Sequence, residues 1–594
     1  MIEQVRTRNF RHTARNLTAV VAASALMLTG CGLFGPDQPD TVAQQFADAL
    51  NNDDVAAAAA MTTDAEAAAA AITSMYEGLG KDGTFTFASA EANDKSDSFT
   101  LDATWPFAEG QQWKYSTTGT ASEQGDDWKI DWKPDLLAPG LADGATLQYT
   151  PTTGKPPQVQ DASGAPILEQ QVVTVVNVDA TADTAAVASL LSPVAPTITA
   201  ESLGADIAEA QGKPVTAITL RGEDVAPIQA QLEQTPGVTL APQTRLLTVN
   251  KDLASPVLGG LTELWQQGQD ESAGWAVQAT SADGTVDTVA GEPGTDAPDI
   301  PTTIEMPRQL AAESALESLP GQSAIVAIRP STGAVVAAAQ NASADAEGPI
   351  ALTGLYPPGS TFKTVTSSAA LQAGAVTPDT VLPCPGTENI EGRQIPNDDE
   401  FDLGEVPFHT AFAKSCNTTM GRLAVGLPPD ALQQAALQFG LGVDYLTPGL
   451  TTVTGNVPIA DTPAARVESA IGQGQVTASP FGMALVAASI ANGSTPAPML
   501  VQGQPATSDQ TPASVPAEVT EQLRTMMRET VTGGTATELQ DIPGLIGKTG
   551  TAESDGGPAH GWFVGIQDDL AFAVFVAGGD SSVPAVQAAG RFLR

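Results

Sequence analysis

The sequence predicts a multidomain α+β protein. At 594 residues the chain is long enough for about three or four domains of roughly 150 residues each. Hydrophobic residues make up 42% of it, which fills several cores and excludes wholesale disorder. In the first part of the chain, segments with helical periodicity precede segments with strand-like alternation, and longer apolar runs begin near residue 305.

The composition argues against two kinds of binding site. The formal net charge is −42, whereas a nucleic-acid-binding face is basic; we interpret the acidity as a contribution to solubility. The cysteines, Cys31, Cys384 and Cys416, form no CxxC pair, and the histidines stand at no metal-ligand spacing from them. The sequence therefore predicts no metal site, no cofactor and no nucleic-acid partner.

Residues 1–31 have the pattern of an export signal. An uncharged apolar stretch, 17–28, follows four arginines; a membrane span needs about 20 apolar residues, so this stretch is short for one. It ends in Leu28-Thr29-Gly30-Cys31, which resembles the lipobox of bacterial lipoproteins. The resemblance implies that Cys31 carries a diacylglycerol thioether and anchors the protein to the extracytoplasmic face of the bacterial cell membrane. An ordinary signal peptide or an uncleaved anchor also fits the pattern.

Residues 37–148 are expected to form a small α+β domain. Val42, Phe46 and Leu50 recur at helical spacing, and an Ala-rich helical stretch extends to about residue 75. Alternating segments at 84–87, 113–115 and 128–132 are strand-like. No acid or base cluster stands out in this region, so we interpret it as a spacer or a partner surface.

The remaining chain divides at residue 305. A linker-like stretch, 149–155, leads into residues 156–300, which mix strand-like runs with polar helices and end in a loop or hairpin rich in Asp, Gly, Thr and Pro. Beyond residue 305, two apolar runs at 324–328 and 334–338 flank a turn. They predict a hairpin of buried strands that leads to a helix beginning near Ser360.

Ser360 and Lys363 form a Ser-x-x-Lys motif. The spacing places both side chains on one face of a helix. A serine hydroxyl is a poor nucleophile until a base takes its proton, and Lys363 can act as that base where a dry, positive pocket lowers its pKa. The preceding Pro-Pro-Gly places the Ser360 N–H at a helix N-terminus, as one donor of an oxyanion hole. Alone, the motif also occurs by chance.

A second motif, Ser-x-Asn, lies at Ser415 and Asn417. On the far wall of a cleft, Ser415 would relay a proton to a leaving amine and Asn417 would hydrogen-bond the backbone of a substrate. An ordinary polar turn has the same sequence, so this motif is also weak when taken alone.

The third motif, Lys-Thr-Gly, begins at Lys548. On a strand at the edge of a cleft, Lys548 would supply the positive potential that keeps Lys363 neutral. The hydroxyls of Thr549 and Thr551 suit a terminal carboxylate, and the Thr551 N–H would be the second oxyanion donor. Gly550 would let a substrate approach the backbone.

The three motifs, in this order and within one domain-sized stretch, resemble the signature set of penicillin-binding proteins and serine β-lactamases. Residues 305–594 are similar to the transpeptidase domain of class B penicillin-binding proteins, which implies a central antiparallel sheet with helices. Residues 37–148 resemble the nuclear-transport-factor-like domain of some members. Residues 156–300 occupy the place of the dimerisation or pedestal domain, although the Arg-Gly that usually opens it is missing here.

The resemblance implies a peptidoglycan D,D-transpeptidase. Ser360 would attack the penultimate D-Ala carbonyl of a stem peptide ending in D-Ala-D-Ala, and an amine on a neighbouring stem would resolve the acyl-enzyme. β-Lactams would acylate the same serine. No glycosyltransferase domain is evident in the sequence, so the glycan strands are expected to come from a separate glycosyltransferase.

Three other functions stay open at this point. A secreted serine β-lactamase has the same motifs, although a class A enzyme also needs a glutamate that activates water, and no convincing Glu-x-x-Leu-Asn segment lies between Ser415 and Lys548. A D,D-carboxypeptidase shares the acylation chemistry. A non-catalytic lipoprotein scaffold would bind cell-wall partners through residues 37–300.

Cys384 and Cys416 remain in an exported chain, in a compartment where disulfides persist. A bridge between them would close a loop of about 30 residues and, in the chain-entropy model, contribute roughly 3 to 4 kcal/mol. It would also hold the loop that carries the second motif. Two buried free thiols are the alternative.

Overall fold

A computed structural model describes residues 39–91, 97–108, 110–125, 127–253, 255–554 and 556–594. The expected export signal and Cys31 lie outside these residues. The chain forms two compact units: one contains the described residues up to Thr152 together with Trp275–Glu292, and the other contains Thr153–Gly274 and Pro293–Arg594. Within the described ranges, no helix combines the length and the apolar character that crossing a bilayer requires.

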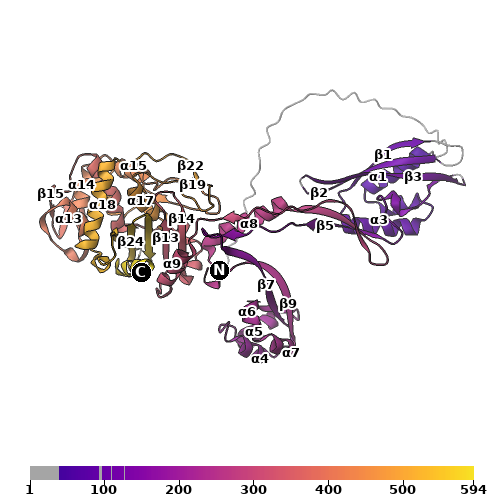
Figure 1. The fold of residues 1–594 in the computed structure, drawn as a ribbon, viewed down its shortest axis with the longest axis horizontal. Coiled ribbons are helices and arrows are strands. Elements are labelled where there is room, and N and C mark those ends of the chain that lie inside the picture. Colours follow the sequence, from indigo (N-terminus) through magenta and orange to yellow (C-terminus); the bar gives the residue numbers. More distant parts are fainter. Residues whose placement is uncertain (1–38, 92–96, 109, 126, 254, 555) are drawn as a thin grey trace, which may run out of the picture. The chain divides into compact units, whose positions relative to one another are not determined.

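The first unit begins with three helices and continues into a four-stranded antiparallel sheet in the order β1-β2-β3-β4. The helices are α1 (Pro39–Asn51), α2 (Val55–Ala60) and α3 (Ala65–Leu79), and the strands are β1 (Thr84–Glu91), β2 (Asp97–Ala108), β3 (Gln111–Gln124) and β4 (Asp127–Ile130). The helical spacing of Val42, Phe46 and Leu50 is confirmed, because all three are buried on one side of α1. Figure 1 shows α1 and α3 packed on this sheet.

A second sheet completes the first unit with residues from a distant part of the sequence. Its order is β11-β10-β5, where β5 is Thr146–Thr152, β10 is Gly274–Thr280 and β11 is Val286–Glu292. Trp275 of β10 enters the same core and packs against Phe107, with ring centroids 5.5 Å apart. The hairpin β10–β11 thus belongs to the first unit, although it lies within residues 156–300.

The second unit opens with a five-stranded sheet in the order β12-β6-β7-β8, in which β9 also pairs with β7. The strands are β6 (Val159–Gln160), β7 (Pro166–Val178), β8 (Val215–Arg221), β9 (Val238–Thr248) and β12 (Ile300–Pro301). Four short helices, α4 (Thr184–Leu191), α5 (Ala200–Glu209), α6 (Gly222–Val225) and α7 (Gln229–Gln234), are associated with it, and α8 (Gly259–Ser272) follows. Val176, Val187 and Leu220 belong to a small core of their own.

A five-stranded antiparallel sheet, β14-β13-β25-β24-β23, organises the rest of the second unit. The strands are β13 (Ser323–Ile328), β14 (Val335–Gln340), β23 (Ile546–Ala552), β24 (His560–Gln567) and β25 (Leu570–Val576). Phe572 and Val574 of β25 enter one core, whereas Ala573 and Phe575 enter another. Side chains alternate across a strand, so both faces of this sheet are buried. The predicted hairpin is confirmed as β13 paired with β14.

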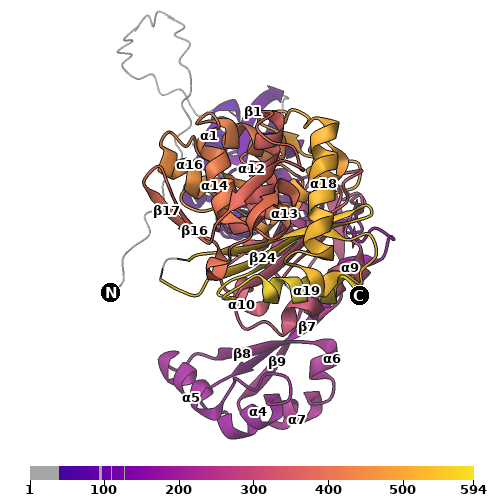
Figure 2. The same cartoon turned by 90° about the vertical axis from the view of Figure 1, so that its left-hand side faces the viewer.

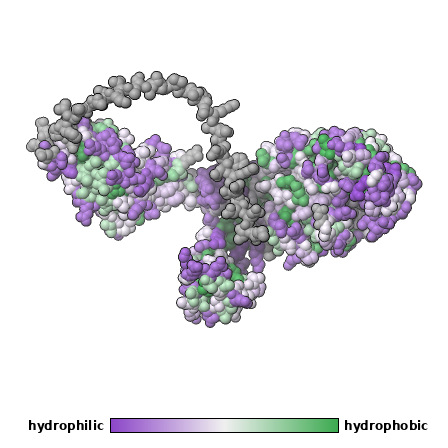
Figure 3. Space-filling model, turned by 180° about the vertical axis from the view of Figure 1, so that it is seen from behind, coloured by the Kyte–Doolittle hydropathy of each residue, from purple (hydrophilic) through white to green (hydrophobic). Residues whose placement is uncertain are grey.

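Helices cover both faces of this sheet. Figure 2 shows α9 (Met306–Glu317) and α19 (Val583–Leu593) on one side. Above the other side it shows α12 (Lys363–Gln372), α13 (Phe408–Ala413), α14 (Asn417–Val425) and α18 (Ala517–Thr532). Helix α17 (Pro480–Asn492) contacts β13, β24 and β25 and is buried from Pro480 to Ile490, which fits its uniformly apolar sequence. On the face seen in Figure 3, apolar residues lie in small scattered groups among hydrophilic ones.

We expect Trp275→Ala to lower the free energy of unfolding of the first unit by about 3 to 5 kcal/mol, the usual cost of removing a buried indole. Trp275 is only 6% exposed. Val286→Ala on the same hairpin, where Val286 is 53% exposed, serves as the control and should have little effect. Denaturant unfolding of the full chain measures both. Equal stability of Trp275→Ala and the wild type would contradict the assignment of this hairpin to the first core.

Candidate active site

Ser360 lies in a short 3-10 helix, η4 (Gly359–Phe362), that runs directly into α12 (Lys363–Gln372). Gly359 has φ 53°, and a Cβ on it would lie 2.4 Å from the carbonyl oxygen of Thr551. A side chain there would be strained and would clash. The glycine therefore lets the turn that carries Ser360 pack against strand β23, which carries the third motif.

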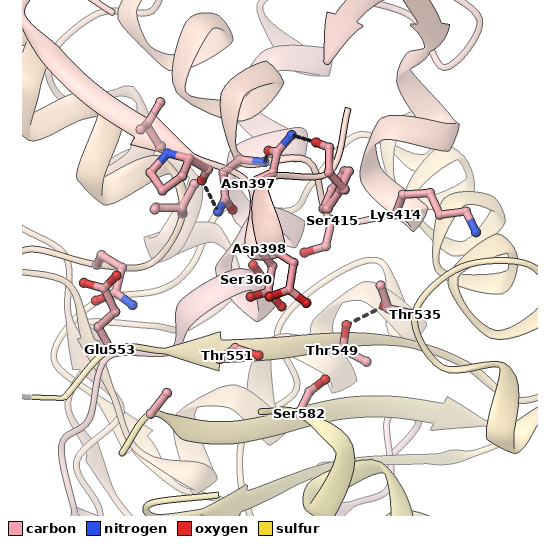
Figure 4. Close-up of a pocket in the computed structure, with 18 of the residues that line it drawn as sticks. Ser360, Asn397, Asp398, Lys414, Ser415, Thr535, Thr549, Thr551, Glu553 and Ser582 are labelled. Atoms are coloured by element: carbon pink, nitrogen blue, oxygen red, sulfur yellow. Dashed lines mark hydrogen bonds between the residues drawn. The ribbon is translucent and has the colours of Figure 1, made fainter. Parts of the chain in front are cut away.

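A cleft of about 890 Å³ opens above Ser360. Five of the residues expected at the site line it: Ser360, Ser415, Asn417, Thr549 and Thr551. Figure 4 shows Thr549 and Thr551 along the strand at its floor and Ser415 on the opposite wall. Charged side chains also line the cleft: Arg393, Lys414, Asp398, Asp399, Glu468, Glu553 and Asp580.

Lys363 is fully buried beneath the cleft. Its Nζ lies 2.6 Å from the carbonyl oxygen of Ser415, 2.6 Å from Oδ1 of Asn417 and 3.1 Å from Oγ of Ser415. The fold thus brings the side chains of the first two motifs together. Among the described residues, the Ser360 hydroxyl has no hydrogen-bond partner, so in the free protein Lys363 is held by the second motif.

Lys548 is the second buried lysine. Its Nζ donates hydrogen bonds to Oγ of Ser415, at 3.0 Å, and to the carbonyl oxygen of Thr549, at 3.0 Å. One serine hydroxyl therefore lies between two lysine side chains that approach it from different elements, α12 and β23. This arrangement couples the charge states of the two lysines.

Burial lowers the pKa of both lysines, because a desolvated ammonium is unfavourable. The pKa of Lys548 falls to about 7. The pKa of Lys363 falls well below its usual value, mainly through burial and further through the charge of Lys548, while Asp398 acts in the opposite direction. When Lys363 is neutral, its lone pair can accept the Ser415 hydroxyl proton, and the oxygen of Ser415 can then accept from Lys548. This arrangement suits Lys363 as a base.

Ser415 and Cys416 form a tight connection between α13 (Phe408–Ala413) and α14 (Asn417–Val425). Ser415 has φ 66°, a conformation that costs a residue with a side chain about 1 kcal/mol or more. Cys416 is joined to Cys384, at the end of β15 (Val381–Cys384), by a disulfide with a Cα–Cα distance of 6.2 Å. The bridge attaches the strained connection to a neighbouring strand.

Asn397 is a further residue that positions the second motif, and it was missed in the sequence. It is only 3% exposed. Its Oδ1 accepts from the backbone N–H groups of Asn417, at 2.8 Å, and Thr418, at 3.3 Å, while its Nδ2 donates to the carbonyl oxygens of Pro385 and Phe401. An asparagine next to acidic residues looks like an ordinary turn residue in a sequence. Only its burial distinguishes it.

Gly550 lies on β23, directly against the turn that carries Ser360. A Cβ on it would lie 2.9 Å from the carbonyl oxygen of Pro358 and 2.9 Å from Cγ2 of Thr361. The lack of a side chain therefore serves the packing of β23 on η4. Beside it, Thr549 Oγ1 lies 2.5 Å from Oγ1 of Thr535, a partner that no motif indicated.

His560 does not line the cleft; its Nδ1 accepts from the N–H of Gly578 and its ring packs edge-on against Phe575. In the part of the chain that the structure describes, no group of three or more His, Cys, Asp or Glu side chains is arranged to hold a metal ion.

Comparisons with known proteins identify the families to which parts of the chain are similar. Residues 323–591 match the family described as "Penicillin binding protein transpeptidase domain", and residues 38–145 match the "NTF2-like N-terminal transpeptidase domain". The chain is 32% identical over 330 residues to the peptidoglycan D,D-transpeptidase PbpA of Mycobacterium tuberculosis, which covers 47% of this chain and 66% of that protein. It is 34% identical over 347 residues to PbpA of Mycolicibacterium smegmatis, covering 47% and 68%. The chain thus matches about two thirds of the length of these relatives.

The fold is similar to that of a chain in the complex between a penicillin-binding protein, PBP2, and MreC from Helicobacter pylori. The TM-score is 0.55 at 16% sequence identity, over 75% of this chain and 98% of that chain. At this identity the likeness concerns the fold alone.

Lys548→Met should move the ascending limb of the pH profile of penicillin acylation toward higher pH. The charge of Lys548 lowers the pKa of Lys363, so removing it lets Lys363 stay protonated, and inactive as a base, to a higher pH. Stopped-flow acylation rates across pH measure the limb. Lys414→Met, which removes an exposed cation of the cleft, is the control and should leave the limb in place. A limb that stays put or moves to lower pH in Lys548→Met would refute this coupling.

Proposed function

The chain belongs to the class B penicillin-binding proteins, and from this premise we propose that it is a peptidoglycan D,D-transpeptidase that cross-links stem peptides through an acyl-enzyme on Ser360. One observation carries the proposal for the site: the hydroxyl of Ser415 lies within 3.1 Å of Lys363 Nζ and 3.0 Å of Lys548 Nζ, beneath the cleft into which Ser360 opens. Such an arrangement supplies a neutral amine and a cation side by side.

The proposed acylation proceeds as follows. Oγ of Ser360 attacks the penultimate D-Ala carbonyl while its proton passes to neutral Lys363. The backbone N–H groups of Ser360 and Thr551 stabilise the oxyanion. The C–N bond then breaks, the proton passes through Ser415 to the leaving D-Ala, and an ester on Ser360 remains. A β-lactam follows the same path, except that its opened ring stays attached.

The hydroxyls of Thr549 and Thr551 and the cation of Lys548 are the proposed partners of the carboxylate at the end of the donor peptide. Asn417 is the proposed hydrogen-bond partner of its backbone. The relatives are named for peptidoglycan, so the site of action is the wall outside the cytoplasm. We further propose that Cys31 carries the lipid anchor and that a separate glycosyltransferase supplies the glycan strands.

Ser360→Ala should abolish covalent labelling by a fluorescent penicillin, because alanine has no hydroxyl oxygen with which to form the ester. Ser343→Ala, the same change at an exposed serine, should label like the wild type. Labelling is read on a denaturing gel, and thermal unfolding should be nearly unchanged in both variants. Labelling of Ser360→Ala would refute the nucleophile, absence of label on the wild type would favour a scaffold, and rapid loss of the label would favour a β-lactamase.

Cys31→Ala should remove the lipid from the mature protein. Mass spectrometry of the N-terminal peptide from bacterial membranes should find a diacylglycerol-modified Cys31 in the wild type and none in the variant. The double variant Cys384→Ser, Cys416→Ser is the control, because it removes the other cysteines and should keep the lipid. An unmodified, uncleaved wild-type N-terminus would rule out this anchor.

A further inference from the structure

A carboxylate without a partner lies in the cleft near Ser360. Asp398 is the first residue of a short turn, η5 (Asp398–Glu400), and lines the cleft together with Ser360. Figure 4 shows its carboxylate pointing into the cleft on the side of Ser360. Within the described ranges, no hydrogen bond or ion pair engages this carboxylate. Of the other acids that line the cleft, Glu468 is paired with Arg393 at 2.9 Å, whereas Asp399, Glu553 and Asp580 have no ion pair within the described ranges.

The backbone holds Asp398 in this position. The preceding residue, Asn397, is fixed by its hydrogen bonds to the Ser-x-Asn segment and to Pro385 and Phe401. The following residues, Asp399 and Glu400, have φ 49° and 53°, which is unfavourable for residues with side chains. Such strain persists where the surrounding structure enforces it, and it concentrates at functional sites. The backbone at Asp398 is therefore set by its neighbours, and the exposed side chain starts from a fixed position at the wall of the cleft.

The charge of Asp398 does not help the formation of the acyl-enzyme. A negative charge near Lys363 favours its protonated form, and a protonated Lys363 cannot accept the proton of Ser360. Burial and Lys548 act the other way. Because this carboxylate does not favour acylation, we expect its role in the second half-reaction, in which an amine attacks the ester.

We propose that Asp398 determines acceptor specificity by binding the protonated primary amine of the acceptor peptide beside the acyl-enzyme on Ser360. The inference rests on the proposed transpeptidase function and adds the group that recognises the second substrate. A carboxylate is the natural partner of an ammonium group, and one without a competing partner is available to it. Neutral nucleophiles and water gain nothing from this contact.

The step balances as follows. The ammonium group of the acceptor, held by the Asp398 carboxylate, gives one proton to solvent through the open cleft and becomes a neutral amine. Its nitrogen attacks the ester carbon, a C–N bond forms and the C–O bond to Ser360 breaks. A second proton passes through Lys363 to Oγ of Ser360. The third stays on the amide nitrogen, so the products are a cross-link and the free serine.

The test is the partition of the acyl-enzyme between nucleophiles in Asp398→Asn, an isosteric change. The full chain is given a D-alanyl thioester donor at neutral pH with D-alaninamide, which is mostly protonated there, or with methanol, which is uncharged. Amide, methyl ester and hydrolysis products are quantified by mass spectrometry, with Ser360→Ala as the blank. Asp398→Asn should reduce aminolysis relative to hydrolysis by about tenfold, as for loss of a charged hydrogen bond, and leave the methanol partition unchanged.

Glu400→Gln is the matched control. It removes a carboxylate two positions after Asp398, from a residue that does not line the cleft, so its product partition should equal that of the wild type. Thermal unfolding and penicillin acylation show that each variant is folded and that Ser360 still reacts. An unchanged amine partition in Asp398→Asn, an equal loss with amine and methanol, or a loss of acylation itself would each overturn the inference while leaving the transpeptidase proposal intact. A wild type that forms no acyl-enzyme would instead refute the proposed function.

Discussion

Two buried lysines that share one serine hydroxyl are the arrangement on which the site depends. Lys363 and Lys548 are both fully buried and both contact Oγ of Ser415. Their pKa values are lowered in the folded protein, so between about pH 7 and the unfolded value of about 10.4 the unfolded chain binds more protons. Stability therefore rises with pH across this window, and the desolvation cost is largest below it. The fold tolerates this cost because a neutral lysine beside a charged one is what an activated serine requires.

The residues around the two buried lysines are held in place by covalent and packing contacts. The strained connection that carries Ser415 is attached to β15 by the disulfide and to the turn before Asp398 by the side chain of Asn397. On the opposite side, Gly550 lets β23 lie against the turn of Ser360, so one packed contact positions both Lys548 and Ser360, the proposed nucleophile. The five-stranded sheet, buried on both faces, fixes β23 in turn. Backbone packing and the disulfide thus position Ser360, Ser415 and Lys548.

Features that depend on a short stretch of sequence could be predicted, whereas features that depend on contacts between distant residues required the structure. Ser360, Lys363, Ser415, Asn417 and Lys548 stood out because each motif combines reactive residue types at fixed spacing. The strands predicted at 324–328 and 334–338 could be recognised because strands buried on both faces are continuously apolar. Asn397 and Asp398 could not be recognised in this way, because the sequence of a polar turn does not show whether a residue in it is buried or exposed. Trp275 belongs, with Val277, Ala279 and Ala290 of its hairpin, to a core whose other members lie at or before Tyr149, a contact that no local pattern encodes.

The charges of the cleft also suit the order of the two substrates. On the proposed mechanism, the carboxylate of the donor peptide binds near Lys548, and this anion favours the protonated forms of both lysines once Lys363 has taken the proton of Ser360. When D-Ala leaves, it carries that anion and a proton away. Lys363 then faces Lys548 without a counter-anion, so its pKa falls again and the base is restored for the second half-reaction. The departure of D-Ala vacates the acceptor side. On the inference above, the carboxylate of Asp398 then binds the acceptor as a cation, before its amine loses a proton and attacks the ester.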